Sequence, residues 1–486
     1  MLGLIQSLKN SFAPVNRIHP EILSLIPNHW EDSHRDENLI QATHVCRSWR
    51  NIFISCPSLW AHLDFANIDK TRIYLERSRS VSLDICFEVG STFYRKEAFL
   101  LAVPRIPRLK ALSVSGDQTK LLSFLVKHFS CDVPLLEELR IHFYADQVPA
   151  LPDKIFNGGL SSLRKLDLAG VIMPMSWMDL SNLTTFNLCD VPEDTIFLSQ
   201  LLDFFESFPL LRHIHLHDSI PGSGGVPAER VVSLSHLEDL SITTKSKGSV
   251  LLNHLFIPAG ASLRLQFNFS VDLYHIPTPN WFPKSPDRLG NLSHITVVNF
   301  CFGVRRRCIR LNGPSGEFYV IENQIFKYKQ PHAVTSQFIR TIDQYDISRA
   351  RWLAITVSDH DPICHGQITE RTAYHILHRM KNLRTLMLIK SENFPFVHSL
   401  SPNFKTVLCP KLEELILYIE DQRQLYLNEL LRMAEERDLR GAKLSAITIV
   451  STKILAPMKE VFQLRKHVLR VEYKIDDAPE WDTLPS

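Results

Sequence analysis

The chain has 486 residues, of which 45% are hydrophobic and 22% are charged, so it is long enough for a large core and has a globular composition. Its 54 basic and 52 acidic residues give a formal net charge of +2, which argues against a global field that attracts nucleic acid or anionic membrane. Nine cysteines occur without a Cys-x-x-Cys pair, which favours a reducing compartment over a secreted disulfide scaffold.

The first 14 residues are predicted to form an N-terminal tail. Their apolar positions are interrupted by Gln6, Ser7, Lys9 and Asn10, which breaks the core that a signal peptide needs. No window of the chain approaches the roughly 18 consecutive apolar residues of a membrane span. We therefore expect a cytoplasmic or nuclear protein with neither membrane nor nucleic acid among its partners.

Residues 15–63 are predicted to form a small helical domain. A first helix opens on His19-Pro20-Glu21, because proline is well tolerated in a first helical turn. Ser33 and Asp36 have the spacing of a capping box for a second helical pattern, which Pro57 ends. The apolar positions of the two patterns are Ile18, Ile22, Leu25, Ile26, Leu39, Ile40, Thr43, Cys46, Trp49, Ile52 and Phe53.

Three separated runs in this segment occur in a specific order. They are Ile18-His19-Pro20-Glu21-Ile22-Leu23, then Val45-Cys46-Arg47-Ser48-Trp49-Arg50, then Pro57-Ser58-Leu59-Trp60. This order resembles the F-box, in particular the F-box that opens many fungal leucine-rich-repeat proteins. His19 stands where that family usually has proline, and the spacer from Ile26 to Leu39 is long and polar.

The resemblance implies a docking surface for a Skp-type adaptor and, through it, a cullin-based ubiquitin ligase. A small helical pair that presents apolar side chains on two sides cannot bury all of them itself, so the surplus needs a partner. The residues expected to bind the adaptor are Ile18, Pro20, Glu21, Ile22, Leu23, Ile26, Leu39, Ile40, Val45, Cys46, Trp49, Leu59 and Trp60.

A charged, helix-compatible stretch from Asp69 to Arg79 is predicted to connect this head to the rest of the chain, within a connecting helix at 64–79. After it, a pattern of apolar, two variable, apolar, one variable and apolar residues recurs. Its copies begin at Leu109, Leu136, Leu163, Leu183, Leu211, Leu237, Leu292, Leu383, Leu412 and Leu444, with weaker copies at Leu83, Leu263, Phe318 and Leu353.

The spacing of these copies indicates a repeat of one strand and one helix. The separations 136 − 109 = 27, 163 − 136 = 27, 211 − 183 = 28, 237 − 211 = 26 and 412 − 383 = 29 fall at the upper end of the leucine-rich-repeat period. Helical patterns lie between the strand motifs at 120–129, 196–208, 372–380 and 424–436. Pro-rich segments at 277–291 and 221–227 are expected to be loops.

Residues 80–473 therefore resemble an irregular leucine-rich-repeat solenoid, followed by a C-terminal tail at 474–486. The predicted fold class is α/β: an N-terminal helical F-box followed by a solenoid with parallel strands on the concave face and helices outside. Each unit leaves its faces open until the next unit stacks on it.

Side chains that flank the core positions of each strand are expected to line the concave face. Early and middle strands offer polar residues there: Glu138, Arg140, His142, Lys165, Asp167, Thr185, Asn187, His213, His215, His217, Asp239 and Ser241. Late strands offer apolar ones: Trp352, Met387, Ile389, Ile416, Tyr418 and Val450. A protein substrate is predicted to bind at His213, His215, Trp352, Met387, Ile416 and Tyr418; the alternative is that residues 468–486 or a helix cover the apolar end.

The sequence offers no catalytic, cofactor-binding or metal-binding motif. Phosphate-binding loops, dinucleotide fingerprints, His-Glu-x-x-His and Gly-x-Ser-x-Gly are all missing. His213, His215 and His217 share a strand face, but adjacent members stand about 7 Å apart, which disfavours chelation of one ion. His360, Asp361, Cys364 and His365 lack a second matched half, and Arg305-Arg306-Arg307 is expected to be a solvated loop.

These observations predict a non-catalytic substrate-recognition subunit, whose head binds a Skp-type adaptor and whose repeats bind an unknown protein substrate. Two alternatives stay open from sequence. The chain could be an F-box and repeat scaffold that acts outside the ligase, as a protein interaction module. It could instead be an enzyme with a site in the loops around 277–316 or 357–366.

Overall fold

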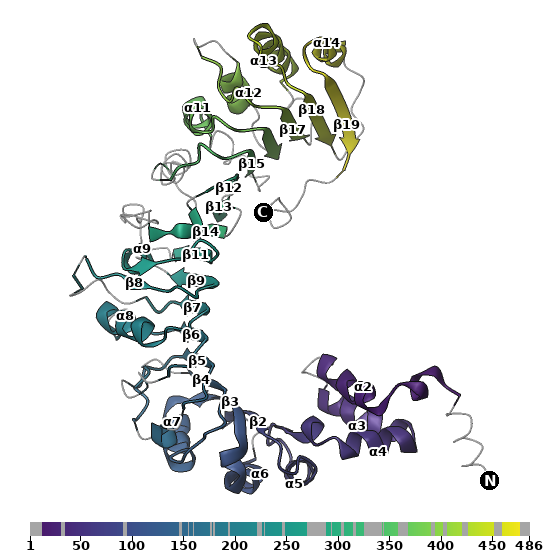
Figure 1. The fold of residues 1–486 in the computed structure, drawn as a ribbon, viewed down its shortest axis with the longest axis vertical. Helices are drawn as coiled ribbons and strands as arrows, with labels where there is room; N and C mark the ends of the chain where they lie inside the picture. Colours follow the sequence, from purple (N-terminus) through teal and green to yellow (C-terminus); the bar gives the residue numbers. More distant parts are fainter. Residues whose placement is uncertain are drawn as a thin grey trace. The chain divides into compact units, whose positions relative to one another are not determined.

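The computed structural model describes residues 12–30, 35–90, 95–144, 148–153, 155–158, 160–174, 177, 180–192, 195–220, 226–227, 229–244, 248–269, 288–292, 294–302, 306–313, 317–324, 343, 345–357, 368–389, 394–401, 406–419, 426–451 and 459–476. The chain divides into two compact units, Met1–Val191 and Pro192–Ser486. Both combine helices with mostly parallel strands (Figure 1). Among the described residues, no helix has the length and apolar character needed to cross a bilayer.

The first unit begins with a group of short helices, residues 14–63, which we call the head. Proline occupies the first turn of α2, as the sequence predicts, and the core of the head is formed by Leu23, Leu39, Phe53 and Trp60. Its elements are η1 (Pro14–Arg17), α2 (Pro20–Leu25), η2 (Ile26–His29), α3 (Arg35–Val45), α4 (Arg47–Ser55), η4 (Pro57–Trp60) and β1 (His62–Leu63).

The second helical pattern of the head is two helices rather than the single continuous one expected. Cys46 breaks the pattern with an extended backbone (φ −158°, ψ 171°), and its Sγ accepts a hydrogen bond from the Trp49 backbone N–H at 3.5 Å. The thiol thus caps α4, a role for which serine, threonine, aspartate and asparagine are the usual signals. Ser33, the expected cap of the first of these helices, lies outside the described residues.

The rest of the first unit is a parallel sheet in the order β1-β2-β3-β4-β5-β6. Core leucines of successive strands lie in register, for example Leu139 beside Leu166 and Leu166 beside Phe186. The elements that follow the head are α5 (Ile68–Arg77), β2 (Leu83–Val89), α6 (Lys96–Ala102), η5 (Val103–Arg108), β3 (Leu109–Asp117), α7 (Gln118–His128), β4 (Glu138–Tyr144), η6 (Ile155–Gly158), β5 (Lys165–Ala169) and β6 (Thr185–Cys189).

The second unit contains a longer sheet in the order β7-β9-β11-β14-β13-β12-β15-β16-β17-β18-β19. All neighbours are parallel except β14 with β13 and β13 with β12. The strands are β7 (His213–His217), β8 (Val232–Ser233), β9 (Asp239–Thr244), β10 (Leu255–Phe256), β11 (Ser262–Phe269), β12 (Val297–Phe302), β13 (Arg306–Asn312), β14 (Glu317–Gln324), β15 (Trp352–Val357), β16 (Thr385–Ile389), β17 (Glu414–Ile419), β18 (Ala446–Ser451) and β19 (Arg470–Ile475).

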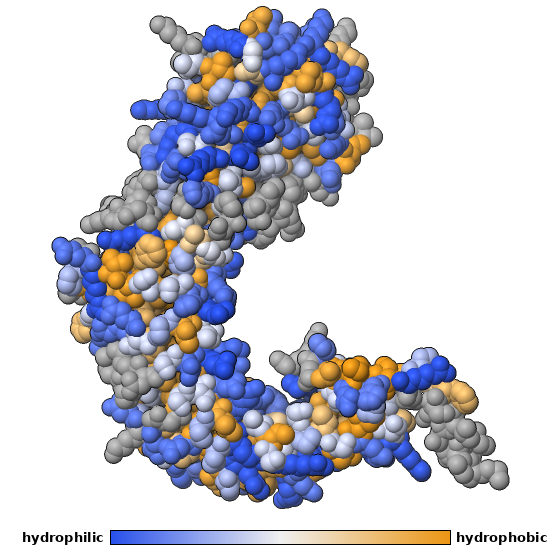
Figure 2. All heavy atoms as spheres, viewed as in Figure 1, coloured by the Kyte–Doolittle hydropathy of each residue, from blue (hydrophilic) through white to orange (hydrophobic). Residues whose placement is uncertain are grey.

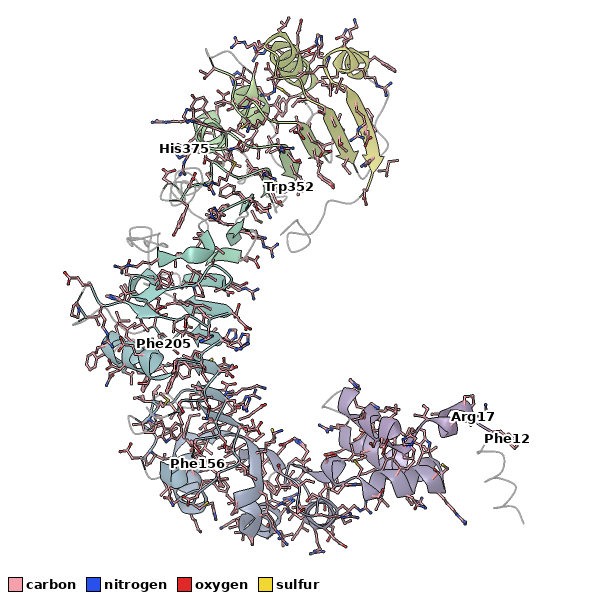
Figure 3. The ribbon with its side chains drawn as sticks, in the orientation of Figure 1. Phe12, Arg17, Phe156, Phe205, Trp352 and His375 are labelled. Atoms are coloured by element: carbon pink, nitrogen blue, oxygen red, sulfur yellow. The ribbon has the colours of Figure 1, made fainter. Side chains whose placement is uncertain are left out.

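Helices of the second unit pack on one face of this sheet. Figure 1 shows α11, α12, α13 and α14 on the same side of the strands. Phe205, labelled in Figure 3, is buried between α8 and the strands. The helical elements are α8 (Leu198–Ser207), α9 (Gly248–Leu252), η9 (Gly290–Leu292), α11 (Glu370–Arg379), α12 (Phe394–Leu400), α13 (Leu427–Leu439) and α14 (Lys459–His467). A strand is thus present at each predicted repeat copy, although the copy beginning at Leu292 yields a strand only from Val297, and the helical patterns at 120–129, 196–208, 372–380 and 424–436 correspond to α7, α8, α11 and α13. Between β5 and β6, and between β7 and β9, the described residues contain no α-helix.

Two segments differ from their predicted structure. Arg306 and Arg307 belong to the strand β13 rather than to a solvated loop, because Ile309 and Leu311 of the same strand are buried and Arg310 forms an ion pair with Glu317 at 2.7 Å. Residues 470–475 form β19, parallel to β18, so the last strand runs two residues into the predicted tail that begins at 474. Residues 477–486, which the alternative of a covered apolar end also invokes, lie outside the described residues. Residues 277–287 and 221–225 of the predicted loops, Arg305 and the cluster at 360–365 lie outside the described residues as well.

Candidate functional site

The head carries more apolar side chains than its own core holds. Ile22 is 56% exposed and Leu25 is 52% exposed; they stand three residues apart on α2 and therefore share one side of it. Ile40 is 44% exposed and Val45 is 58% exposed on α3. We call these four residues the head patch. Figure 2 shows apolar residues gathered on the surface of the head where Figure 1 places α2.

The residues predicted to bind an adaptor fall into two groups in the structure. Exposed or half-buried ones are available to a partner: Ile18, Pro20, Glu21, Ile22, Ile26, Ile40, Val45, Cys46 and Trp49. Buried ones form the core of the head: Leu23, Leu39, Leu59 and Trp60. Leu25, which the prediction left out, is exposed beside Ile22, and its place in the apolar periodicity of the helix was the signal that could have included it.

Trp60, a member of the second group, is held inside the first unit by three contacts. Its indole Nε1 donates a hydrogen bond to the backbone oxygen of Phe53 at 2.8 Å. Its ring meets Tyr74 edge-on at 5.0 Å between centroids, and the guanidinium of Arg77 lies over it at 4.3 Å. Trp60 thus joins α4 to α5.

A charged group fixes α3 of the head to α5. The Lys70 ammonium donates hydrogen bonds to Asp36 and, at 2.6 Å, to Asp64, while the Tyr74 hydroxyl donates to Asp36 at 3.1 Å. Burial alone would lower the pKa of Lys70, but the hydrogen bonds to the two carboxylates outweigh it and raise that pKa. Burial likewise opposes the shift at Asp64, whose pKa Lys70 and the Ala66 backbone N–H nevertheless hold below its usual value.

The polar residues predicted for the sheet face in the first unit pair with one another. Asp167 accepts hydrogen bonds from Arg140 Nε at 2.9 Å and interacts with His142 Nε2 at 3.1 Å, and Lys165 donates to Glu138 at 2.7 Å. In the register of β4 and β5, Glu138 lies beside Lys165 and Arg140 beside Asp167. These cross-strand ion pairs neutralise the face locally, so its charge gives little attraction for a charged ligand.

The middle strands show the predicted alternation. His213 and His215 are half-buried and His217 is exposed, while Ile214 and Leu216 between them are buried. His213 Nε2 lies 3.6 Å from Glu238, and His215 Nε2 lies 3.6 Å from Asp239. The two histidines predicted to contact a substrate therefore lie next to carboxylates on the face opposite the core. Thr185, Asn187 and Ser241 are half-buried on their strands as well.

The structure brings the apolar residues predicted at the late end together. Trp352 on β15 (labelled in Figure 3), Ile416 and Tyr418 are half-buried and pack against a cluster of Ala354, Met387 and Ile389. Met387 is only 7% exposed and Ile389 only 1%, and Val450 on β18 is buried too. The predicted substrate contact at Met387 is therefore corrected, because Met387 is buried together with Ile389 and Val450, and Trp352, Ile416 and Tyr418 are the half-buried members of the set.

A surface cavity that the sequence prediction missed lies in the second unit. It has a volume of about 310 Å³ and is lined by His294, Thr296, Arg349, Arg351, Asn382, Arg384 and Lys411. These residues directly precede the strands β12, β15, β16 and β17. A signal was available, since Arg351 and Arg384 occupy the same position in two successive copies of the strand motif, immediately before the first residue of the strand.

Comparison with known proteins leaves the family open. No protein-family model matches the chain, and no curated protein matches it. Among solved structures, the chain is similar to a structural-genomics target from Bacteroides fragilis at 11% sequence identity, over 84% of this chain and 78% of the other, with a TM-score of 0.20. At that TM-score the similarity carries no functional argument.

Proposed function

We propose that the protein is the substrate-recognition subunit of a Skp-cullin-F-box ubiquitin ligase. In this proposal the head is an F-box that binds a Skp-type adaptor, and the strand and helix repeats are a leucine-rich-repeat body that binds a protein substrate. The observation that carries the proposal is the exposure of Ile22 and Val45 on helices whose core is already filled by Leu23, Leu39 and Phe53.

The energetics of the head patch support a protein partner. Burying a fully exposed isoleucine, leucine or valine side chain contributes about 1.5–3 kcal/mol. The four residues are 44–58% exposed, so a partner that covered them would gain roughly half of this at each residue before ordering costs. The Lys70 group holds α3 to α5 and Trp60 joins α4 to α5, so little of that gain is lost to ordering these helices on binding. The three sequence runs that resemble the F-box also lie in this head, in the order that the family shows.

The repeated sheets supply the second half of the proposal. Parallel strands in register, with helices on one face, form a rigid support that can hold a substrate at a fixed distance from a transferred ubiquitin. Fixing a substrate near the charged conjugating enzyme raises its local concentration, and this proximity is the whole of the contribution we propose. The transfer chemistry belongs to other subunits in this scheme.

The test is adaptor capture by the full-length chain. Ile22→Glu and Val45→Glu place charge in the head patch, and each should weaken binding of a purified Skp-type adaptor at least tenfold, because about 1.4 kcal/mol corresponds to a factor of ten. Val126→Glu is the matched control, since Val126 is 43% exposed on α7 outside the head. Equal adaptor binding by all four proteins, or none by the unaltered chain, would refute the proposal.

Copurification separates the ligase from the scaffold. Recovery of both adaptor and cullin with the unaltered chain, and loss of both with Ile22→Glu, supports the ligase subunit. Recovery of the adaptor without cullin instead favours a scaffold that acts outside the ligase. Alanine at Trp352 and Tyr418, the accessible aromatic residues of the late strands, should then reduce substrate capture and leave adaptor binding unchanged.

A further inference from the structure

The cavity in front of β12, β15, β16 and β17 combines several cations on a rigid edge. Arg349, Arg351, Arg384 and Lys411 contribute its formal positive charges, with Asn382 and His294 beside them. Among the described residues, the carboxylate within ion-pair distance of these four is Glu413, 3.2 Å from Arg384. Arg349, Arg351 and Lys411 carry no such counter-charge in that part of the chain.

Backbone hydrogen bonds fix where these side chains start. The Arg351 N–H donates to Thr296 O, the Arg384 N–H to Arg351 O, and the Glu413 N–H to Arg384 O, each at 2.8 Å. These bonds extend the parallel hydrogen-bond ladder to the residue before each strand, so Arg351 and Arg384 lie side by side on neighbouring strands. Neighbouring strands lie about 4.8 Å apart, which sets a comparable separation for their Cα atoms.

A second row lies two residues earlier in each repeat. Asn382 Nδ2 donates to Ser348 O at 2.9 Å, and Lys411 Nζ donates to Asn382 Oδ1 at 2.7 Å. The Arg349 guanidinium interacts with the His294 ring. Lys411 and Arg349 of this row are thus held at the cavity by Asn382 and His294. The pKa of the Asp346 carboxyl is lowered by hydrogen bonds from Ser348 and also by the charge of Arg349.

The same edge position in other repeats provides an internal comparison. In the first unit the residues there are Lys110, Glu137, Arg164 and Thr184, linked by the same 2.8 Å backbone bonds, and Lys110 lies 3.7 Å from Glu137. In the early part of the second unit they are Arg212 and Glu238, which form an ion pair at 2.7 Å. In these other strands, each lysine or arginine at the edge position thus has a glutamate at the same position of a neighbouring strand, whereas the neighbours of Arg351 are Thr296 and Arg384.

We propose that this cavity binds a phosphoryl group, carried by a small phosphorylated compound or by a phosphorylated protein segment. A guanidinium presents paired N–H donors that match phosphate oxygens, and several cations exceed what a single carboxylate would neutralise. A cavity of about 310 Å³ admits a group of this size. Single-stranded nucleic acid fits less well, because its recognition relies on aromatic stacking platforms and the cavity lining offers only the His294 ring.

The experiment is calorimetric titration of the full-length chain with pyrophosphate at constant ionic strength. Arg351→Gln combined with Arg384→Gln should weaken binding at least tenfold while circular dichroism stays unchanged, since both side chains are exposed. Lys110→Gln combined with Arg164→Gln is the matched control at the same repeat position of the first unit, and it should change affinity less than twofold. Loss in both double variants, or no binding to the unaltered chain, would overturn the proposal.

Two further arms identify the source of the phosphoryl group. A phosphoserine peptide that binds more tightly than both its unphosphorylated form and pyrophosphate identifies a protein segment, whereas pyrophosphate binding as tight as that of the peptide identifies a small compound. If a single-stranded oligonucleotide binds more tightly than both the peptide and pyrophosphate, and this binding is lost in the Arg351 and Arg384 double variant, the ligand is nucleic acid and the proposal is wrong. None of these arms involves the head, so their outcome is independent of adaptor capture.

Discussion

Replacing Trp60 with alanine should destabilise the head without altering the head patch. The ring is 1% exposed, and its replacement removes the packing against Tyr74, the hydrogen bond to Phe53 O and the contact with Arg77. Large aromatic-to-alanine changes in protein cores cost about 3–5 kcal/mol, and we expect ~4 kcal/mol here. Trp60→Phe keeps most of the buried area, and Phe53 O still accepts from the Cys56 N–H, so its cost should be about 1–2 kcal/mol.

Hydrogen exchange of the full-length chain is the suitable measurement, because a chain of two units need not unfold in one transition. Protection of α4 should fall in Trp60→Ala by more than a hundredfold, and adaptor binding should fall in proportion to the population of the opened head. If α4 of Trp60→Ala stays as protected as in the unaltered protein and adaptor binding is nevertheless lost, Trp60 contacts the adaptor directly and the division of the head into core and surface is wrong.

Two other changes test buried polar groups. Arg437→Ala on α13 should cost ~3 kcal/mol of stability, because the buried guanidinium donates hydrogen bonds to Leu408 O at 2.9 Å and Cys409 O at 3.0 Å. The loss should be seen as faster hydrogen exchange in α13. As a control, Glu435→Ala at an exposed position of the same helix should change stability by no more than about 0.5 kcal/mol. Asp64→Asn should be less stable than the unaltered protein above about pH 4, and the difference should vanish as the pH falls through the lowered folded pKa of Asp64; a difference that persists at pH 2 would contradict the role of Lys70.

The positions of the strands could be predicted because apolar residues alternate along each strand wherever one of its faces is buried, and this alternation recurs from repeat to repeat. Leu112, Leu139 and Leu166 stack in register, as the spacing of their motifs indicates. The break at Cys46 was missed because a thiol is a weak and unusual cap. The strand β13 was missed because its arginines suggested a solvated loop, although Ile309 and Leu311 alternate with Cys308 and Arg310 in the pattern of a strand.

The functional surfaces were harder to predict because they depend on what covers a residue, which periodicity does not report. Alternation placed Met387 and Ile389 on the face opposite the helices, yet both are buried. The same limit applies in the head, where Ile22 and Leu23 are adjacent in sequence and one is exposed while the other is core. The cavity required knowledge of which repeats stack, since Arg351 and Arg384 are 384 − 351 = 33 residues apart.

The stacking that builds the cavity also implies a cost that a ligand can relieve. Arg351 and Arg384 start from adjacent rungs, and like charges on neighbouring strands destabilise a sheet where opposite charges would stabilise it. Glu413 offsets this repulsion on one side of Arg384, but Thr296 offers no carboxylate on the far side of Arg351. An anion bound between them removes the repulsion in the folded state alone, so it must stabilise the second unit by linkage. Pyrophosphate should therefore slow hydrogen exchange in β15 and β16 of the unaltered chain and leave β4 and β5 unchanged.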